Sequence, residues 1–394
     1  MAGTPPVQIR DFYRRIQNSD TDALAQQPYY VDPRAFNNPV SPSPLLRLAT
    51  LRNAAWQESY HAVQEAFFDF AGRCMYCANT KRHIHGMQAS PVLEVVGFPG
   101  LYIYPKLLSN ALVHRGLIDM LMHDQLADPA TRTNLHEKYH VTYPEPSITK
   151  GEANTSFFDP AASQLKMQPR LEGSGDWTAS PLTTRALLDK LRWFTVGDAS
   201  ADGSMPPKIR ALVENILPIK AHSATAYVSS NQDPLELRQG HGDAGTFLDT
   251  SLGCDGVVVV GLEDSGERER GATSSEAHSV VDADCWRDLL VGSDSEDDEK
   301  APDRQHVSEA GNRDDTITST RNTPCLAAIH LRSTDALLFT GLSRRAWYGV
   351  AKVLPGSSPA FEQQWPCWPG TVERRGQDNW KGCMKGRRID LVVG

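Results

Sequence analysis

The chain has 394 residues, 40% of them hydrophobic, which is enough for one large or two moderate globular domains. It has no run of eighteen apolar residues and no apolar segment of the secretory kind near its start, so we expect neither a membrane-spanning helix nor secretion. The formal net charge is −8. The seven cysteines are an odd number, which fits reduced thiols in a cytoplasmic or nuclear protein, although a mitochondrial location stays open.

The first part of the chain, residues 1–184, is predicted to be a mostly helical extension. Short helices separated by Pro-rich connectors are expected up to residue 70, and the clearest is 54–73, where apolar residues recur at helical spacing. A short strand is expected at 101–105, followed by a helix with one apolar face at 107–126. The stretch 128–182 is rich in Pro, Thr, Ser and Asn, which predicts a loop.

The second part, residues 185–394, has the pattern of a β-domain. A helix at 180–190 is expected to lead into a strand-like run at 190–198. Further runs of β-branched or alternating residues are separated by Gly and Asp turns, which is typical of short strands. These runs are IKAHSATAYVSS (219–230), DGVVVVGLED (255–264), CLAAIHLRSTDALLFTG (325–341) and RRIDLVV (387–393). The sequence therefore predicts an α+β protein.

An acidic segment interrupts the β-domain. Residues 263–315 carry 17 Asp and Glu against 6 Lys and Arg, which leaves 31 acidic and 34 basic residues in the rest of the chain. Because like charges with few apolar groups disfavour packing, we expect a disordered insertion over 263–323. Ser293 and Ser295 stand among acids as phosphorylation sites often do, although a plain solvated loop explains the segment as well. The slightly basic remainder is compatible with a polyanionic partner.

One His-x-Asp sequence occurs, His241 and Asp243, within RQGHGDAGTFLDTSLG (238–253). Residues i and i+2 of a strand face the same side, so this spacing can present an imidazole and a carboxylate to one metal ion. A third ligand would complete the facial triad of non-haem Fe(II) oxygenases. The spacing alone indicates little, because a turn in which Asp243 caps a backbone N–H gives the same two residues.

The order of features around His-x-Asp resembles the AlkB family of iron- and 2-oxoglutarate-dependent nucleic-acid dioxygenases. SLGCDGVVVVGLED follows it, then ALLFTGLSRRAWYGVAKVLPGS, and finally a strand that contains arginine. The resemblance runs the length of the chain except for 128–182 and the acidic insertion. Four further segments resemble the eukaryotic branch that includes the AlkB homologue acting on transfer RNA and DNA: RDFYRRIQNSDTDAL (10–24), GFPGLYIYP (97–105), LLDKLRWFTVG (187–197) and SRRAWYGVAKVLPG (343–356).

The resemblance implies a double-stranded β-helix (jelly roll) over 185–394, with the helical extension packed on it. It implies oxidative demethylation of N-methylated bases in transfer RNA or DNA, with Fe(II) and 2-oxoglutarate as cofactors and molecular oxygen consumed. The 2-oxo acid becomes succinate and CO₂, and the hydroxylated methyl group leaves as formaldehyde. Iron would be held by His241, Asp243 and Tyr348, the last at the position of the family's second histidine. Arg388 matches the arginine that pairs with the 5-carboxylate of 2-oxoglutarate.

The most consequential departure from the family pattern is Tyr348. A phenol has a pKa near 10 and binds a metal strongly only after losing its proton, whereas neutral imidazole suits Fe(II). His330 is the nearest histidine and is expected to be a surface or packing residue. A second hypothesis therefore stands beside the enzyme: a catalytically degenerate AlkB-like protein that binds nucleic acid or regulates without full iron ligation.

The cosubstrate contacts also depart from the pattern. Arg387 would take the role of Arg388 if the register slipped by one. The family's second arginine falls on Gly394. An Asn-x-Tyr motif that usually touches the cosubstrate falls on residues 226–228. Tyr227 is a candidate partial substitute, but alternation is expected to point it to the opposite face.

Two other groups of residues have alternative interpretations. Cys74, Cys77, His83 and His85 have the ligand types of a zinc site, or are thiols and imidazoles in a solvated loop, where Lys81 and Arg82 are candidate phosphate contacts. An aromatic and basic group either stacks and neutralises single-stranded nucleic acid or covers an edge of the β-domain. This group comprises Trp365, Trp368, Trp380, Lys381, Lys385, Arg387 and Arg388.

Overall fold

The computed structural model describes residues 3–36, 43–71, 88–108, 111–126, 131–142, 166–169, 189–198, 205, 209–210, 213–214, 221–240, 245–263, 324–365 and 382–394. The chain divides into two compact units, one of Met1–Leu262 with Cys325–Gly394 and the other of Glu263–Pro324. The acidic insertion, with Ser293 and Ser295, lies outside the described residues apart from its first residue. Among the described helices, none combines the length and the apolar character needed to cross a membrane.

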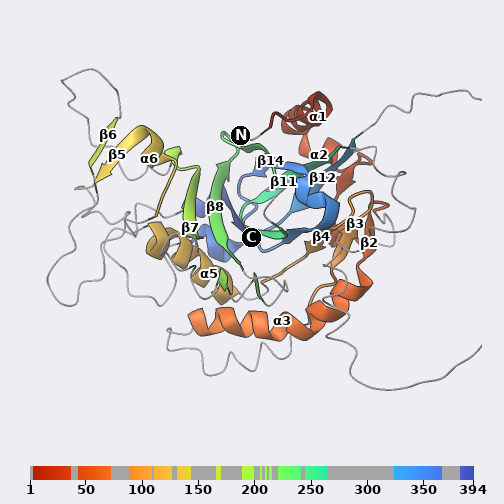
Figure 1. Cartoon of the computed structure of the whole chain (residues 1–394), viewed down its shortest axis with the longest axis horizontal. Helices are drawn as coiled ribbons and strands as arrows, with labels where there is room; N and C mark the ends of the chain where they lie inside the picture. Colours follow the sequence, from red (N-terminus) through yellow and green to blue (C-terminus); the bar gives the residue numbers. More distant parts are fainter. Residues whose placement is uncertain are drawn as a thin grey trace, which may run out of the picture. The chain divides into compact units, whose positions relative to one another are not determined.

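In the part of the chain that is described, five strands form the smaller of two large sheets, in the spatial order β1-β12-β11-β14-β9, of which β12, β11 and β14 are labelled in Figure 1. Strand β1 pairs parallel to β12, and the other pairs are antiparallel. Strand β11 has four valines in succession that are all buried, which is why it lacks polar alternation. The strands are β1 (Tyr30–Val31), β9 (Leu235–Gln239), β11 (Asp255–Leu262), β12 (Cys325–Leu331) and β14 (Trp347–Leu354).

The larger sheet has eight strands among the described residues, in the order β2-β3-β4-β13-β10-β15-β8-β7. All of its pairs are antiparallel. Its strands are β2 (Leu46–Leu48), β3 (Leu93–Val95), β4 (Leu101–Tyr104), β7 (Trp193–Asp198), β8 (Ser223–Ser230), β10 (Phe247–Gly253), β13 (Ala336–Phe339) and β15 (Arg387–Val393).

The two sheets pack face to face around one apolar cluster. Phe247 and Phe339 of the larger sheet belong to the same buried cluster as Val258 and Val260 of the smaller sheet. The two phenylalanine rings stack with their centroids 4.5 Å apart and an interplanar angle of 10°. Side chains on the inner faces of the two sheets therefore share one interior.

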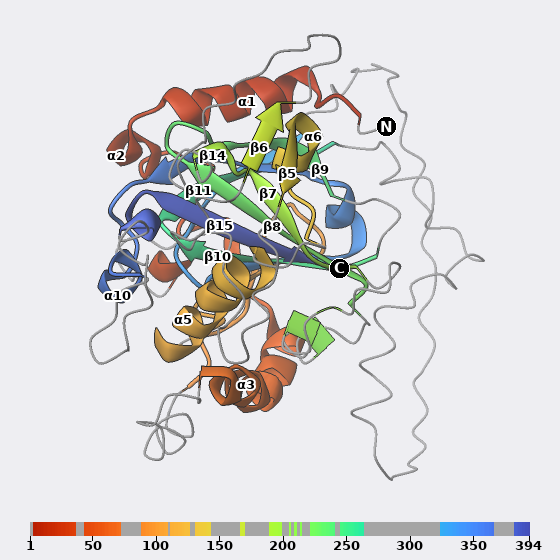
Figure 2. The same cartoon turned by 90° about the vertical axis from the view of Figure 1, so that its left-hand side faces the viewer.

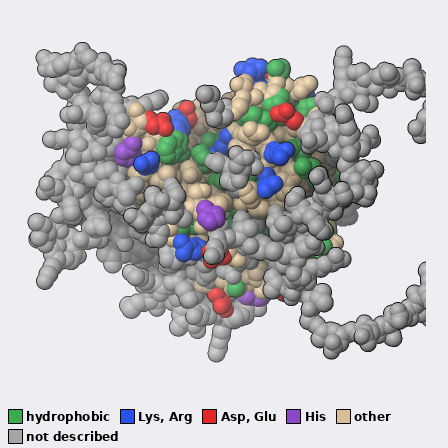
Figure 3. Space-filling view, viewed as in Figure 1, with side chains coloured by type: hydrophobic (Ala, Val, Ile, Leu, Met, Phe, Trp, Pro, Cys, Tyr) green, Lys and Arg blue, Asp and Glu red, His purple; other side chains and the backbone are tan. Residues whose placement is uncertain are grey.

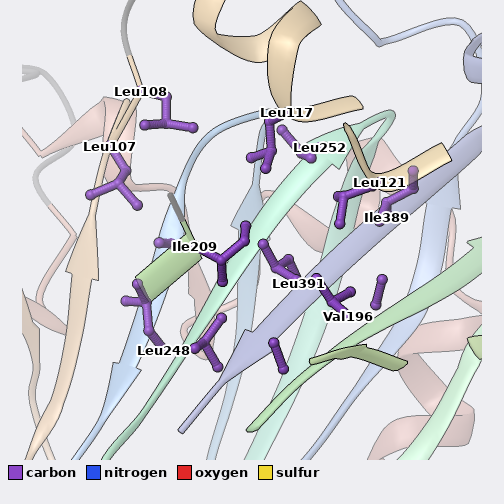
Figure 4. Packing of buried hydrophobic residues seen from close by; sticks show 14 of the residues in the cluster. Leu107, Leu108, Leu117, Leu121, Val196, Ile209, Leu248, Leu252, Ile389 and Leu391 are labelled. Carbon is purple, nitrogen blue, oxygen red and sulfur yellow. The ribbon is translucent and has the colours of Figure 1, made fainter. Parts of the chain in front are cut away.

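Helices cover the outer faces of both sheets, on opposite sides of the molecule in Figure 2. Helix α3 (Thr50–Ala71) and helix α5 (Ala111–Asp119), which continues as a π-helical turn over Met120–Gln125, pack on the larger sheet. Figure 4 shows Leu117 and Leu121 from this helical layer beside Leu252 of β10 and Ile389 and Leu391 of β15.

Helix α1 (Val7–Asn18) covers the smaller sheet through one apolar stripe. Ile9, Phe12, Tyr13 and Ile16 recur at the i, i+3, i+4, i+7 spacing and are buried. The Tyr13 hydroxyl donates to backbone carbonyls of β9 and β14, both at 3.1 Å, which fixes the helix across these strands. The remaining helical segments are α2 (Thr21–Leu24), α6 (Leu135–Lys138), α10 (Ala360–Gln363) and the 3₁₀ turns Pro33–Ala35, Gly341–Arg345 and Cys383–Lys385.

Most elements expected from the sequence are present, and two expectations need correction. The helix expected at 54–73 is α3, the strands expected at 101–105 and 190–198 are β4 and β7, and the later β-runs form β8, β11, β12, β13 and β15. The loop predicted over 128–182 is wrong in part, because α6 is followed by β5 (Tyr139–Thr142), which pairs with β6 (Lys166–Pro169).

The mostly helical extension also supplies strands β1 to β4 to the two sheets. Of these strands only β4 was expected from the sequence, whereas β1 to β3 are two or three residues long, too short to show a period.

Candidate functional site

Polar and charged side chains gather on the inner faces of the sheets. Tyr227 lies opposite Asp390, which lies opposite Ser251 on the next strand, so the three share one face. Their chain neighbours Ala226 and Ile389 belong to the core under the helices, so this face is the inner one. We call the following residues the interior polar cluster: Tyr227, Arg238, Asp249, Ser251, Tyr348, Arg388 and Asp390.

The Arg388 guanidinium is buried and all three of its nitrogens have acceptors. Nε donates to the two oxygens of Asp390 at 2.9 and 3.1 Å, and Nη2 lies 2.8 Å from Asp390 Oδ1 and donates to Ser251 Oγ. Nη1 donates to the carbonyls of Leu331 at 3.1 Å and Cys254 at 3.4 Å. An internal carboxylate therefore occupies the edge of Arg388 that pairs best with a carboxylate ligand.

Gly256 on β11 makes room for this arginine. A Cβ at that position would lie 2.9 Å from Cδ of Arg388 and 3.0 Å from its Nε and Nη1. Glycine is therefore the residue that lets the two sheets close over the buried ion pair.

Arg238 reaches the interior because β9 contains an extra residue. Tyr348 pairs with Arg238 and Val350 pairs with Leu235, so three steps along β9 match two along β14. Such a bulge reverses the alternation of side chains, which turns both Leu235 and Arg238 inward. Gly349 lies at the bulge, where a Cβ would approach two carbonyl oxygens of β9 to 2.8 Å, so the close approach of the strands requires glycine.

The Arg238 guanidinium is held between two aromatic rings but lacks acceptors. Its Cζ lies 3.5 Å from the ring centroid of Tyr227 and 4.6 Å from that of Tyr348. Nη2 is 3.8 Å from Asp249 Oδ2, beyond hydrogen-bonding distance. The side chain is 19% exposed, yet Nε, Nη1 and Nη2 are all shielded from solvent and have no hydrogen-bond partner among the described residues. The exposed part is therefore its carbon stem.

Tyr348 is enclosed by aromatic rings and by this guanidinium. Its ring centroid lies 4.9 Å from that of Phe339 and 5.5 Å from that of Phe247. Burial raises the pKa of Tyr348 above its usual value, and Asp249 raises the pKa further, while Arg238 lowers it. The phenol therefore keeps its proton at neutral pH.

Asp249 is a buried carboxyl group whose charge is poorly stabilised. Burial, and then the neighbouring Asp390, raise the pKa of Asp249 to about 7, although Arg238 and Arg388 lower it. Its Oδ1 has no hydrogen-bond partner among the described residues. Asp249 is therefore the group of the cluster that exchanges a proton near neutral pH.

The His-x-Asp segment begins and ends beside Tyr348. Gly240 donates its N–H to the carbonyl just before β14 at 3.1 Å, and Phe247, the first residue of β10, lies in ring contact with Tyr348. His241 and Asp243 themselves lie outside the described residues. The chain thus brings both ends of the predicted metal-binding segment to the position of the predicted third ligand.

The described residues fit the two predicted cofactors unequally. A protonated phenol next to a guanidinium does not suit a divalent cation, so Tyr348 does not fit as an iron ligand. Nowhere in the described ranges do three His, Cys, Asp or Glu side chains gather as a metal site would need. For an anionic cosubstrate, Arg388 is already saturated, whereas Arg238 presents donors without acceptors.

Two expectations about neighbouring residues are settled by the pairing of the strands. Tyr227 was expected to face away from the site, which is wrong: it faces Arg238, because residues 225 and 227, and not 226 and 228, point inward. Arg388 points inward, while Arg387 donates to Cys383 Sγ at 2.9 Å and pairs with Asp189. The one-residue register slip therefore does not occur.

The remaining candidate residues are distributed as follows. Trp365 is fully buried and donates from Nε1 to Asp119 at 2.7 Å, so the proposal that it stacks on nucleic acid at the surface is wrong. His330 is a packing residue, hydrogen bonded to Tyr30 at 2.9 Å and to Asp255 at 3.2 Å. Outside the described residues lie Cys74, Cys77, Lys81, Arg82, His83, His85, Trp368, Trp380 and Lys381.

The basic side chains visible in Figure 3 lie at separate places on the described part of that face. They do not form one continuous patch there.

Comparison with known proteins gives three curated relatives. The N6-methyladenosine RNA demethylase ALKB1 of Pyricularia oryzae is 26% identical over 317 residues, 75% of this chain and 74% of the relative. The N6-methyladenosine RNA demethylase ALKBH of Cryphonectria parasitica is 25% identical over 277 residues, 66% of this chain and 97% of the relative. The tRNA demethylase abh1 of Schizosaccharomyces pombe is 22% identical over 317 residues, 75% of this chain and 78% of the relative. No model of a known protein family matches the chain.

Proposed function

We propose that this chain, which belongs to the AlkB family, removes methyl groups from N-methylated bases of RNA by oxidation that depends on Fe(II), 2-oxoglutarate and oxygen. Relatives named as demethylases of N6-methyladenosine RNA and of tRNA support RNA as the substrate class. Methylated DNA is the alternative polymer. The two facing sheets are, in this proposal, the walls of a double-stranded β-helix.

One geometric observation carries the proposal. The segment that contains His241 and Asp243 is anchored at both ends beside Tyr348, on the inner side of the sheets where Arg388 and Arg238 also lie. The inward guanidinium groups suit an anionic cosubstrate, and an imidazole and a carboxylate in the segment between these anchors are ligand types that non-haem iron takes.

Five residues in or beside the interior polar cluster are considered in this proposal. Iron would be held by His241 and Asp243, since Tyr348 does not fit as a ligand. When bound, iron and 2-oxoglutarate supply the oxidation that releases the methyl group as formaldehyde. Arg238 supplies positive charge for the anionic cosubstrate, and Phe247 and Tyr348 exclude water from the reacting groups.

The test is formaldehyde and succinate release by the full chain with Fe(II) and 2-oxoglutarate. The substrates are an RNA that contains N6-methyladenosine, methylated tRNA, and methylated DNA of matched sequence, with unmethylated RNA as the control. We expect release with a methylated RNA and its loss in His241→Ala. No formaldehyde from any methylated substrate would refute the proposal.

A second candidate function is favoured by two specific contacts. Tyr348 stands where the family has a metal ligand, and Asp390 saturates the arginine that would receive the cosubstrate. We propose as this alternative an AlkB-like protein that binds methylated nucleic acid without turnover. Retention of RNA on a filter, weakened by salt, together with release of formaldehyde by Tyr348→His and not by the natural chain, would select it.

A further inference from the structure

We propose that Arg238 is the receptor for a small dicarboxylate, for which 2-oxoglutarate is the probe, and that this binding needs no metal ion. The identity of the ligand rests on the proposed function. The assignment of the receptor rests on the contacts of Arg238 itself.

The first step of the argument is that Arg238 is incompletely satisfied. Its three nitrogens are shielded from solvent and unbonded within the described residues, and the nearest carboxylate oxygen is 3.8 Å away. A buried charged donor without acceptors is unfavourable, so a guanidinium in this state is expected to take up an anionic partner. Arg388 differs, because protein groups accept from all three of its nitrogens.

The second step is that the two aromatic rings leave the edge of the guanidinium available. Rings that lie 3.5 and 4.6 Å from Cζ contact a guanidinium over its faces, whereas its N–H groups point outward in its own plane. A carboxylate accepts two parallel N–H bonds in that plane.

The third step is the position of Gly394 at the end of β15. Arg388, Asp390, residue 392 and Gly394 alternate onto one face of the strand, so the chain has glycine on the inner face where the family has its second arginine. A Cβ on Gly394 would lie 3.1 Å from the Cβ of Phe247, whose ring contacts Tyr348 beside Arg238. Gly394 therefore supplies no guanidinium on this face, whereas Arg238 points inward from the other sheet, beside Tyr348.

The size of the ligand follows from the position of the receptor. The nitrogens of Arg238 are shielded between two sheets, which suits the carboxylate of a small molecule and not the backbone of a polynucleotide. No ligand of a metal takes part in these contacts, so binding is expected to survive metal chelation.

The experiment is calorimetric titration of the full chain with 2-oxoglutarate in excess EDTA, with thermal unfolding as a second readout. The variants are Arg238→Gln, which removes the charge, Arg238→Lys, which keeps the charge without the planar fork, and the matched control Arg14→Gln on the exposed face of α1. We expect binding to the natural chain and to the control, at least about tenfold weaker binding to Arg238→Lys, and none that can be measured for Arg238→Gln.

Thermal unfolding distinguishes a receptor from a structural arginine. Without ligand, Arg238→Gln is expected to unfold close to the temperature of the natural chain, because the guanidinium has no hydrogen bond among the described residues and its nearest carboxylate oxygen is 3.8 Å away. With 2-oxoglutarate, the unfolding temperature of the natural chain rises and that of the variant does not. A lower unfolding temperature for ligand-free Arg238→Gln would contradict the assignment, since it would mean that Arg238 serves the fold.

The two proposals fail in different ways. Equal binding by the natural chain and Arg238→Gln, or no binding by the natural chain in EDTA, overturns the receptor assignment even where formaldehyde is released. Binding that depends on Arg238 without any release of formaldehyde supports the receptor and refutes the proposed demethylase.

Discussion

Arg388 and Asp390, two residues apart on β15, form an ion pair inside the protein, with Nη2 and Oδ1 2.8 Å apart and at most 1% of either side chain exposed. The pair is isolated from solvent and from salt, so its two charges depend on each other. Breaking a buried pair by removing one partner costs far more than breaking an exposed one.

The Asp390→Asn variant is therefore expected to lose about 3 kcal/mol of unfolding free energy, because Arg388 would be left as an uncompensated buried charge. Urea denaturation of the natural chain and the variant measures this loss. Asp189→Asn is the matched control, since Asp189 pairs with Arg387 but is 58% exposed, and we expect a loss of less than about 1 kcal/mol. Equal losses in the two variants would show that burial does not decide the strength of the Arg388 pair.

Tyr348→His is expected to create metal affinity that the natural residue lacks. A neutral imidazole binds a divalent ion at neutral pH, whereas burial keeps the phenol protonated. Electron paramagnetic resonance of Mn(II) measures the change, which we expect to be at least about tenfold in dissociation constant. Tyr348→Phe is the control and should leave Mn(II) binding unchanged. If Tyr348→His gains nothing, His241 and Asp243 do not converge on that position.

Asp249 is expected to make the stability of the protein depend on pH. Its pKa of about 7 in the folded state lies above the usual value of about 3.9, so the folded state binds more protons than the unfolded state between these values. Stability therefore falls as the pH rises from about 4 to 7 and levels off above that range. Denaturant midpoints measured across this range should show the decline in the natural chain and a smaller one in Asp249→Asn.

The control for this pH series is Asp233→Asn, because Asp233 is 48% exposed and pairs with Arg192 at the surface. We expect it to follow the natural chain throughout. At pH 8 the Asp249→Asn chain is expected to be more stable than the natural one by a few kcal/mol, because it lacks the buried charge. An Asp249→Asn chain with the same pH profile as the natural one would show that Asp249 does not titrate in this range.

Gly349→Ala is expected to destabilise the fold by about 2 kcal/mol, since its Cβ would meet two backbone carbonyl oxygens at 2.8 Å and the strands would have to separate. The same change should displace Arg238, whose inward position depends on the bulge at this point. Urea denaturation checks the first effect and 2-oxoglutarate titration the second. Gly386→Ala is the control, because nothing lies within 4 Å of its Cβ and its φ is −123°. Normal stability of Gly349→Ala would contradict this account of the bulge.

The sequence was sufficient to predict the long strands, because runs such as Val257–Val260 and Ile389–Val393 contain enough β-branched residues to be recognised as strands. Arg388 was assigned by the resemblance, with Arg387 left open as the alternative, and the structure shows that Arg388 is the one that points inward. Regular alternation is a local property, and it held throughout β15.

Arg238 could not be predicted in the same way. Its inward direction depends on an extra residue in β9 relative to β14, and that pairing joins segments more than a hundred residues apart. Tyr227 was misplaced for a related reason, because the register of β8 was assigned one residue away from the observed pairing. The feature of the sequence that comes closest to indicating the bulge is Gly349, next to Tyr348. A glycine inside a strand is typical of a bulge or of close backbone approach.

The pairing of β11 with β12 has a practical consequence. Leu262 lies directly opposite Cys325, so the two ends of the Glu263–Pro324 segment already meet as a hairpin would. Excision of that segment and its replacement by a four-residue turn should leave the hydrogen bonds of the sheet in place. Replacing the natural segment by four residues is about four halvings of the loop length, and each halving contributes about 0.6 kcal/mol. The shorter loop should therefore add roughly 2 kcal/mol to the free energy of unfolding. The sheet should therefore accept a spacer of another length or composition between Leu262 and Cys325, and whatever the natural segment does can be assayed by its absence.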